Sequence, residues 1–504
     1  VIVPVYNTLP ELLTCLDSMV AQTAAPGSLE VITVDDGSTD GSGDTLDRYA
    51  EAHPGLFRVL HQENSGGPAR PCNAGLDAAR GRFVFFLGSD DYLDPEAAER
   101  MVAAADRWES DVLCVRLVGV NGRWVNQRLF LAGDRPEIEF PSELLASALS
   151  NTKLFRRDLL ERHGIRYALD MRVGSDQPFV IEAMSKARRI SVLADRPYYY
   201  AVKRDSAENI TYSSTWRQRL QGIASIMDHV AAILPAGPDR DTILQRHLSG
   251  EVATVLRRDF AEVPADERAE LMAEVNRVTA AYLTEPIRRG LRVVTRLRYD
   301  LSRDGDQDGL ADLIGAEETP LALLVTDDAV FQAPWAYADR VRQERFRIEA
   351  EAMPGTFWAT LGDGVARLDG STLVVEGRIG VLPASGDRVR GWLAPAEDRT
   401  GWGARAVPRA EKWPPRSRPL EIRPDGTYSW RLDLEPIQRA VAGSAWALRV
   451  EIDTPEKTWR LPLRAQLAAA GSFTRGSQAL VMRSLPDEDG RLLFELTDAK
   501  DHHG

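Results

Sequence analysis

The chain has 504 residues, with 62 Lys and Arg against 75 Asp and Glu, and therefore a formal net charge of −13. This length exceeds what one ordinary hydrophobic core organises, so two or three domains are expected. A hydrophobic fraction of 44% excludes wholesale disorder, and the acidic balance argues against a nucleic-acid partner. The three cysteines (Cys15, Cys72 and Cys114) are too dispersed for a metal-ligand motif or a disulfide framework, which suits a reducing compartment.

Membrane insertion is not expected from the hydropathy pattern. No apolar stretch approaches the roughly 20 residues that a membrane span requires. The chain opens directly on the strand-like pattern Val1-Ile2-Val3-Pro4, without the charged and apolar regions of a signal peptide. We expect a cytoplasmic protein, with peripheral contact at the inner face of the membrane left open.

The N-terminal part alternates strand and helix patterns. Strands are expected at 1–5, 29–34, 57–60 and 83–87, and helices at 10–21, 45–52, 69–79 and 95–108. Such alternation predicts an α/β fold with a parallel sheet covered on both faces, whose ligands lie beyond the carboxyl ends of the strands. Tyr6-Asn7, Asp35-Asp36 and Asp90-Asp91 all follow expected strands directly. A binding site is therefore predicted at this edge.

The hydrophobic pattern of the sequence changes twice in the rest of the chain. Residues 214–313 have a mostly helical pattern, and short alternating segments after residue 321 predict an antiparallel, immunoglobulin-like β-sandwich. These segments are 372–377, 389–393, 428–434, 445–452 and 458–463. The expected domains are 1–213 (α/β), 214–320 (helical linker) and 321–504 (β-rich). An acidic loop from Asp304 resembles a calcium loop, but Gly315 occupies the position of the bidentate Glu, which favours a plain acidic turn.

The paired carboxylates suggest a cation site. Carboxylates crowded at one sheet edge repel one another unless a cation or donor groups compensate. Mg²⁺ or Mn²⁺ bridging a carboxylate and a diphosphate is the usual compensation. The chain has neither a P-loop nor a GxGxxG sequence after its first strand, so those nucleotide-binding classes do not fit. The alternative is that Asp35-Asp36 and Asp90-Asp91 only cap helices.

Four motifs make the pattern more specific. In chain order they are VIVPVYN, VITVDDGSTDGS, ENSGGPARPCNAGLDAARG and FVFFLGSDDYLDPEAAERMV. Together they resemble the family 2 glycosyltransferases of GT-A (Rossmann-like) fold, and NTKLFRRDLLE and GSDQPFVIEAM resemble the acceptor half of that domain. The GSDDYL, NGR and SDQ segments are most similar to bacterial wall teichoic acid N-acetylglucosaminyltransferases, in which a helical linker and a β-rich region follow the catalytic domain.

The resemblance implies roles for individual residues. Pro4 and Tyr6 would enclose the uracil of a UDP-sugar, and Asp36 and Asn64 would read its polar edge. Asp90 would hold the metal on the diphosphate. Asp91 would support it, and the cations expected near the donor sugar or the leaving UDP are Arg123, Lys153 and Arg204. For these three cations, plain surface exposure is the alternative.

Asp176 is the implied catalytic base. At the start of its helix it would take the acceptor's proton as that oxygen attacks the anomeric carbon, inverting its configuration; the alternative is a helix cap. Three positions depart from the family pattern: Gly88 replaces the first Asp of DxD, Ser175 replaces an acidic residue, and Cys72 replaces an Arg for which Arg70 is the nearby substitute.

The expected function is an inverting, Mn²⁺- or Mg²⁺-dependent transfer of a sugar, GlcNAc by subgroup likeness, from UDP to a hydroxyl of a cell-envelope polymer. Alternatives are a small natural product, lipid or peptide acceptor, or a catalytically weak glycan-binding protein. The β-rich region would bind glycan or form a homotrimer or another homo-oligomer. Among its tryptophans, Trp430, Trp446 and Trp459 are expected in the core. The candidates for binding glycan at the surface are Trp392, Trp402 and Trp413.

Overall fold

The structure is a computed structural model. It describes residues 1–171, 174–203, 215–319, 321–326 and 329–349, together with separate strand segments between residues 361 and 498. The chain divides into two compact units, Val1–Val255 with Arg277–Thr284, and Leu256–Asn276 with Glu285–Gly504. The division falls inside the helical region, so the first helices after residue 214 belong to the N-terminal unit. The three-domain scheme with boundaries at 213 and 320 stays a prediction.

The N-terminal unit is built on one sheet with the strand order β3-β2-β1-β4-β8-β6-β9, in which a bridge between Ile2 and Phe86 joins the two halves. Its strands are β1 (Ile2–Val5), β2 (Val31–Asp35), β3 (Phe57–His61), β4 (Phe83–Phe85), β6 (Val112–Val115), β8 (Lys153–Arg156) and β9 (Ile190–Leu193). The strands expected in the first 90 residues are confirmed. These strands run parallel, as expected. The later strand β8 runs antiparallel to β4 and β6.

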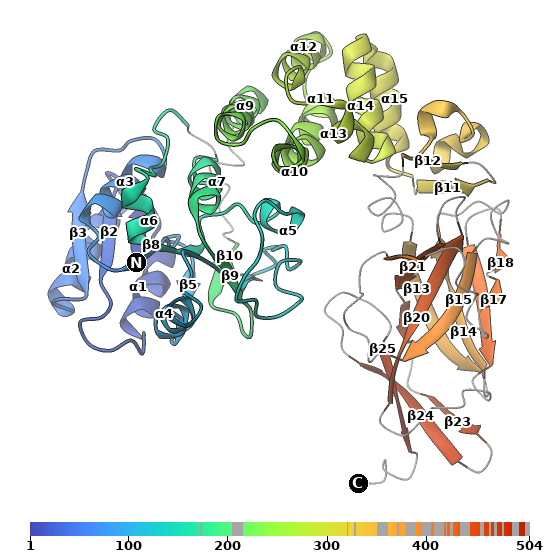
Figure 1. Cartoon of the computed structure of the whole chain (residues 1–504), viewed down its shortest axis with the longest axis horizontal. Helices are drawn as coiled ribbons and strands as arrows, with labels where there is room; N and C mark the ends of the chain where they lie inside the picture. The colour runs from blue at the N-terminus through green and yellow to red at the C-terminus, as the bar shows by residue number, and fades with distance from the viewer. Residues whose placement is uncertain are drawn as a thin grey trace. The chain divides into compact units, whose positions relative to one another are not determined.

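Helices cover both faces of this sheet, as Figure 1 shows in blue and green. They are α1 (Glu11–Val20), α2 (Ser42–Ala52), α3 (Ala69–Ala78), α4 (Ala97–Arg107), α6 (Arg157–Arg162) and α7 (Asp176–Lys186). The four expected helices are confirmed. Strand alternation divides the core: Val3 packs with Leu16 of α1 and Met101 of α4 on one face, while Phe86 contacts Phe179 of α7 on the other.

A small sheet, β5-β10-β7, lies next to the carboxyl edge of the main one. Its strands are β5 (Tyr92–Leu93), β7 (Leu117–Val120) and β10 (Tyr199–Val202). The β10 strand runs parallel to β7 and antiparallel to β5. It therefore joins the segment after Asp91 to the turn at Asn121-Gly122, where both residues have positive φ. A short helix, α5 (Glu143–Ala146), precedes β8.

The helical region begins with a capping box in which Thr215 and Gln218 bond each other's backbone. Its helices are α9 (Trp216–Ile233), α10 (Pro238–His247), α11 (Phe260–Glu262), α12 (Arg268–Thr279), α13 (Glu285–Gly290), α14 (Val293–Asp304) and α15 (Gln307–Ala316), with π-helical turns at Leu248–Val252 and Val255–Asp259. The acidic loop is a turn: Gly305 ends α14 at φ 70°, and Asp306 caps α15. Among the described residues, no helix combines the length and apolarity of a membrane span.

The C-terminal region is β-rich. A hairpin of β11 (Leu321–Val325) and β12 (Val330–Pro334) precedes two larger sheets. The first sheet contains β13 (Leu361–Asp369), β14 (Thr372–Ile379), β18 (Glu421–Ile422), β19 (Thr427–Asp433) and β22 (Ala465–Leu467). The second contains β15 (Val389–Pro395), β16 (Arg405–Val407), β17 (Arg418–Pro419), β20 (Ser444–Asp453), β21 (Thr458–Pro462), β23 (Gly471–Arg475), β24 (Gln478–Leu485) and β25 (Leu493–Asp498). The five expected strand segments are confirmed, and a β-sandwich stays a prediction.

Of the six tryptophans considered in the β-rich region, only Trp430 has a described side chain. Trp430 on β19 is 2% exposed and so belongs to the core, as its alternating strand predicted. The side chains of the remaining candidates, Trp392, Trp402, Trp413, Trp446 and Trp459, lie outside the described residues. Core packing is therefore confirmed for Trp430 alone, and glycan binding by this region stays untested.

Candidate active site

The strand register brings the predicted nucleotide residues to one edge. Val5 pairs with Asp35 and Asp35 with His61 in parallel strands, so the residues that follow, Tyr6, Asp36 and Gln62, emerge side by side. Tyr6 is 48% exposed beside half-buried Pro4. An aromatic side chain left open at a strand end is suited to stacking on a flat base.

Asp36 is buried and already has partners. Its carboxylate accepts hydrogen bonds from Gln62 Nε2 at 2.5 Å, from Ser65 Oγ at 2.9 Å and from the Ser65 backbone N–H. Asn64 is exposed, and its Oδ1 accepts from the Gly66 N–H. The structure thus brings Asp36 and Asn64 together as expected. It adds Gln62 and Ser65, which the sequence reading missed because polar residues in a loop carry no periodic signal.

The neighbouring Asp35 has a structural partner that was also missed. Its Oδ2 lies 3.0 Å from His61 Nδ1, and His61 Nε2 lies 3.1 Å from Asp47 on α2. The hydrogen bonds to Asp35 and Asp47 raise the pKa of His61 above its ordinary value. The imidazole therefore ties the end of β3 to β2 and α2, and Asp35 supports the loop rather than facing a ligand.

Asp91 is held on both oxygens. Its Oδ2 accepts a hydrogen bond from the Tyr199 hydroxyl, and its Oδ1 accepts from the Val202 N–H at 2.7 Å. Burial and the neighbouring charge of Asp90 raise the pKa of Asp91 to about 6, against the opposing effect of these hydrogen bonds. Asp90 is half-buried at the same turn. Asp91 is therefore anchored by β10, and the role of Asp90 as a cation ligand stays a prediction.

Arg123 is the predicted cation that reaches this turn. Its Nη1 donates to the Val202 carbonyl at 2.9 Å and lies 3.6 Å from Asp91 Oδ1, while the side chain is 40% exposed. Arg70 is exposed at the start of α3. Arg204 lies outside the described residues. Arg123 and Arg70 are thus accessible to an anionic ligand, whereas the expectation for Arg204 remains a prediction.

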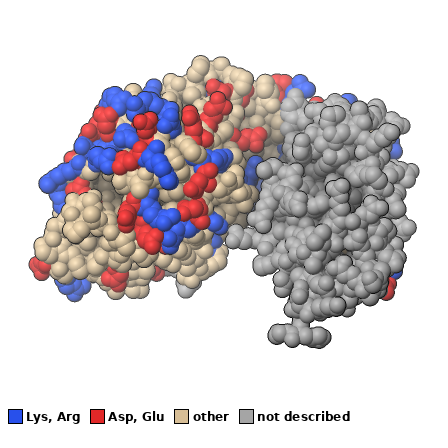
Figure 2. Space-filling model, turned by 60° about the horizontal axis from the view of Figure 1, so that its bottom comes forward, with Lys and Arg blue, Asp and Glu red and all other residues tan. Residues whose placement is uncertain are grey.

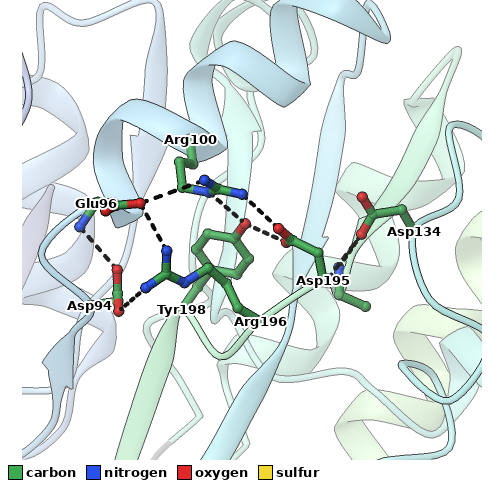
Figure 3. A network of polar contacts seen from close by, with 8 residues as sticks. Asp94, Glu96, Arg100, Asp134, Asp195, Arg196 and Tyr198 are labelled. Atoms are coloured by element: carbon green, nitrogen blue, oxygen red, sulfur yellow. Dashed lines mark hydrogen bonds and ion pairs between the residues drawn. The ribbon is translucent and has the colours of Figure 1, made fainter.

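The segment before β10 is fixed by a separate polar network, shown in Figure 3. Arg100 of α4 donates to Asp195 at 2.6 Å and to the Tyr198 hydroxyl at 3.2 Å. Arg196 pairs with Asp94 and Glu96 at 3.2 and 2.8 Å. Because this network lies just beyond Asp91 on one side and just before Tyr199 on the other, it holds both segments of the site in place.

Asp176 and Lys153 lie at the same sheet edge. Because β8 is antiparallel, its first residue, Lys153, lies where β4 and β6 end, opposite Cys114. Asp176 is the first residue of α7 and is partly buried. Burial raises the pKa of Asp176, and the positive charges of Lys153 and Arg246 oppose that shift. A carboxylate held at a helix N-terminus with a raised pKa is suited to proton transfer.

Lys153 is buried. Its side chain is 2% exposed, its ammonium donates to the Ser150 carbonyl at 2.5 Å, and burial lowers its pKa. The exposed-cation alternative is therefore wrong for Lys153, whose charge acts on Asp176, and an approach to the donor sugar or diphosphate stays a prediction. Cys72 is also buried and lies within the field of Asp176, so the residue in place of the family Arg faces the interior.

The helical region contributes to this side of the site. Arg246 of α10 donates to Gln177 at 3.2 Å and to Glu251 at 2.5 Å, and His247 Nδ1 lies 2.6 Å from Glu251. Although burial opposes ionisation, His247 and Arg246 lower the pKa of Glu251 to about 2. Since Gln177 directly follows Asp176, the α10 helix supports the start of α7. The sequence patterns did not indicate this contact.

A metal ion at this edge would need phosphate oxygens of the substrate as additional ligands. No group of three His, Cys, Asp or Glu side chains suited to a metal occurs in the described part of the chain. Asp91 has both oxygens engaged and Gly88 carries no side chain, and the half-buried Asp90 lies at the same turn. Mg²⁺ and Mn²⁺ commonly bind through one or two carboxylates plus substrate phosphates, and this donor set is compatible with that mode.

Two family models match the chain. Residues 1–164 match the model described as glycosyl transferase family 2, and residues 218–314 match the glycosyl transferase TarS linker domain. The fold and the motifs at the strand ends agree with the first match. Residues 1–164 therefore resemble family 2 glycosyltransferases, and residues 218–314 resemble the TarS linker domain.

Among curated proteins, the chain resembles enzymes that act on poly(ribitol-phosphate). It is 37% identical over 205 residues to a poly(ribitol-phosphate) beta-glucosyltransferase of Bacillus spizizenii (41% of this chain, 32% of the relative). It is 38% identical over 205 residues to the Staphylococcus aureus beta-N-acetylglucosaminyltransferase TarS (41% of this chain, 35% of the relative). These matches span about a third of each relative's length.

Solved structures extend the likeness. The fragment of S. aureus TarS crystallised with UDP-GlcNAc matches with a TM-score of 0.58 and 26% identity, covering 69% of this chain and 98% of that one. The longer TarS crystal structure matches with a TM-score of 0.64 and 22% identity, covering 99% of this chain and 85% of that one, which is a likeness of fold alone. The chain thus resembles wall teichoic acid N-acetylglucosaminyltransferases in order of parts as well as in motifs.

Proposed function

We propose that this protein is an inverting, metal-dependent glycosyltransferase that moves a sugar from UDP to a hydroxyl of a teichoic-acid-type polymer. The proposal rests on the observation that Asp36 and Asp90 follow parallel strands at one edge of the sheet, and that Asp176 lies within electrostatic range of Lys153, where β4 and β6 end. The likeness to TarS crystallised with UDP-GlcNAc supports the choice of donor. The names of the relatives support a poly(ribitol-phosphate) acceptor.

Donor binding would use the open side chains at this edge. Tyr6 offers its exposed ring to uracil beside Pro4. Asp36 and Asn64, fixed by the loop between residues 62 and 66, would accept the imide N–H and bond a carbonyl of the base. Arg123 and Arg70 would offset the negative charge of the diphosphate. A cation held by Asp90 would neutralise the charge that develops on the leaving UDP.

Asp176 would act as the general base. As a carboxylate, it accepts the proton of the acceptor hydroxyl while that oxygen forms its bond to the anomeric carbon and the bond to UDP breaks. Lys153 and Arg246 favour its ionised form, and burial favours the protonated form. Gln177, bonded to Arg246 and Glu251, would hold the first turn of α7 in place.

The experiment is a donor and acceptor matrix on the full chain. UDP release and sugar incorporation are measured with UDP-GlcNAc and UDP-glucose, because the two curated relatives differ in the transferred sugar. The acceptors are poly(ribitol-phosphate), a lipid-linked glycan and a peptide, each with Mn²⁺ and with EDTA. The expected result is Mn²⁺-dependent transfer to the polymer with inversion at the anomeric carbon. Turnover that is equal in EDTA, or no UDP release from any donor, contradicts the proposal.

Oligomerisation and location are further parts of the proposal. We expect a homotrimer or another homo-oligomer formed by the β-rich region, working in the cytoplasm at the inner face of the membrane. Light scattering on the full chain measures the mass in solution directly. Sedimentation with vesicles of anionic lipid measures membrane contact, with neutral vesicles as the control.

A further inference from the structure

Tyr199 has a polar role at the donor edge that the sequence did not indicate. Its side chain is 3% exposed, its hydroxyl donates to Asp91 Oδ2, and its oxygen accepts the Gly88 N–H at 3.3 Å. The ring packs against Phe85, at the end of β4, with centroids 6.2 Å apart. The buried hydroxyl is thus satisfied as both donor and acceptor, and it joins β10 to the turn that carries Asp90.

Gly88 makes room for this arrangement. A Cβ atom at position 88 would lie 2.9 Å from Asp91 Oδ2, 3.1 Å from Asp90 Oδ1 and 3.2 Å from the Tyr199 hydroxyl. A side chain there would therefore displace a carboxylate or the phenol. The departure from DxD at this position is matched by Tyr199 and Asp91, which occupy the space that the side chain would take.

The second oxygen of Asp91 extends the connection. It accepts the Val202 N–H at 2.7 Å, and Arg123 bonds the Val202 carbonyl from the other side. Both oxygens of Asp91 therefore bind groups of β10, at Tyr199 and Val202. Fixing the carboxylate in this way also fixes the peptide that holds Arg123 at the edge.

We propose that Tyr199 is a positioning residue of the donor site, which fixes Asp91 against β10 and, through the Gly88 N–H, holds the turn that carries Asp90, the residue expected to bind the cation on the donor diphosphate. This inference rests on the proposed function. In this chain, the Tyr199–Asp91 contact would occupy the place of the carboxylate that is missing at Gly88, the first position of the DxD-like motif. Tyr199 acts through Asp91 and the Gly88 peptide and does not itself touch the donor.

The test is calorimetric binding of UDP to the full chain, with Mn²⁺ and with EDTA. Tyr199→Phe should weaken Mn²⁺-dependent binding roughly tenfold, the size of one hydrogen bond to a charged group, and should change metal-free binding by less than about twofold. Tyr200→Phe is the matched control, because it also removes one phenol hydroxyl from β10. The ring of Tyr200 stacks on Tyr92 at a centroid distance of 4.7 Å. The control should bind like wild type.

Gly88 provides a second route that leaves Tyr199 intact. Gly88→Ser should also weaken Mn²⁺-dependent binding, because its side chain meets Asp91 and Tyr199. In the double variant with Tyr199→Phe, the two losses should be less than multiplicative, since they disturb the same contact. Tyr199→Phe with wild-type Mn²⁺-dependent affinity, or fully multiplicative losses, overturns the inference. A wild-type chain that binds no UDP under either condition instead refutes the proposed function on which it rests.

Discussion

Asp91 and Asp111 are both buried aspartates of the N-terminal unit, and they lie at opposite edges of the same sheet. Asp111 precedes β6 and bonds Arg156 at 3.1 Å and Arg188 at 3.0 Å, and its pKa is lowered by the Arg188 contacts despite burial. Asp91 follows β4, bonds a phenol and an amide, and has a pKa raised to about 6. Asp111, which pairs with two arginines, is a structural carboxylate. Asp91 is held mainly by neutral donors, at the edge where we propose that a ligand binds.

The Asp111 edge also has a surface pocket of about 510 Å³, lined by Asp106, Glu109, Arg156, Arg188 and Arg189. Its arginines are paired with acidic side chains: Arg188 bonds Asp111, and Arg189 lies 3.5 Å from Glu109. Acidic and basic side chains are interspersed over the N-terminal unit in the view of Figure 2. A concave surface whose charges are paired with one another does not by itself define an active site. The candidate site residues lie at the opposite edge of the sheet.

The largest expected effect is at the ligand edge. Asp176→Asn removes the proton acceptor, so kcat should fall by roughly 10²–10⁴-fold, while Mn²⁺-dependent UDP affinity stays within about twofold. Steady-state turnover and calorimetric UDP binding measure the two quantities. Equal kcat in the variant would show that another group takes the proton.

The pH dependence of turnover examines the same residue. Because burial raises the pKa of Asp176, the base is protonated at a higher pH than an ordinary aspartate. The acidic limb of the kcat profile should therefore lie above the usual aspartate range, with activity lost as the pH falls through it. A limb within the ordinary aspartate range would contradict the raised pKa.

The next effect is at the structural edge. Asp111→Ala leaves Arg156 without its buried carboxylate, so the free energy of unfolding should fall by about 2–3 kcal/mol, with UDP affinity unchanged. The folded pKa of Asp111 is lowered, so this stability is present above the unfolded pKa and is lost as the pH falls through the folded pKa. Urea unfolding at pH 7 and pH 3 tests both statements, and weaker UDP binding would break the separation of the edges.

The smallest effect concerns His61, which supports the ligand edge from behind. His61→Gln should cost less than about 1 kcal/mol, because the imidazole is half-exposed. The folded pKa of His61 is raised, so its contribution is full below the unfolded value near 6.5 and disappears as the pH rises through the folded pKa. The stability difference from wild type should therefore be larger at pH 6 than at pH 9. An equal difference at the two pH values would contradict the ion-pair role.

Sequence alone determined the order of strands and helices in the first 108 residues, because apolar periodicity and turn residues are local signals. It also predicted Asp36, Asp90 and Asp176 as site residues, since each follows a strand or starts a helix within a motif that resembles family 2 glycosyltransferases. Parallel strands then bring the loop carboxylates Asp36 and Asp90 to one edge without further information.

Only the tertiary structure showed which side chains at this edge are held by hydrogen bonds within the protein. The Tyr199–Asp91 bond joins residues 108 positions apart, and the Gln177–Arg246 bond joins residues 69 apart. Lys153 was expected either near the donor or exposed, and the structure shows that it is buried at the start of the antiparallel strand β8. Partners that distant are set by strand order and helix packing rather than by any local pattern, which is why the sequence located the edge and the folded chain assigned the contacts within it.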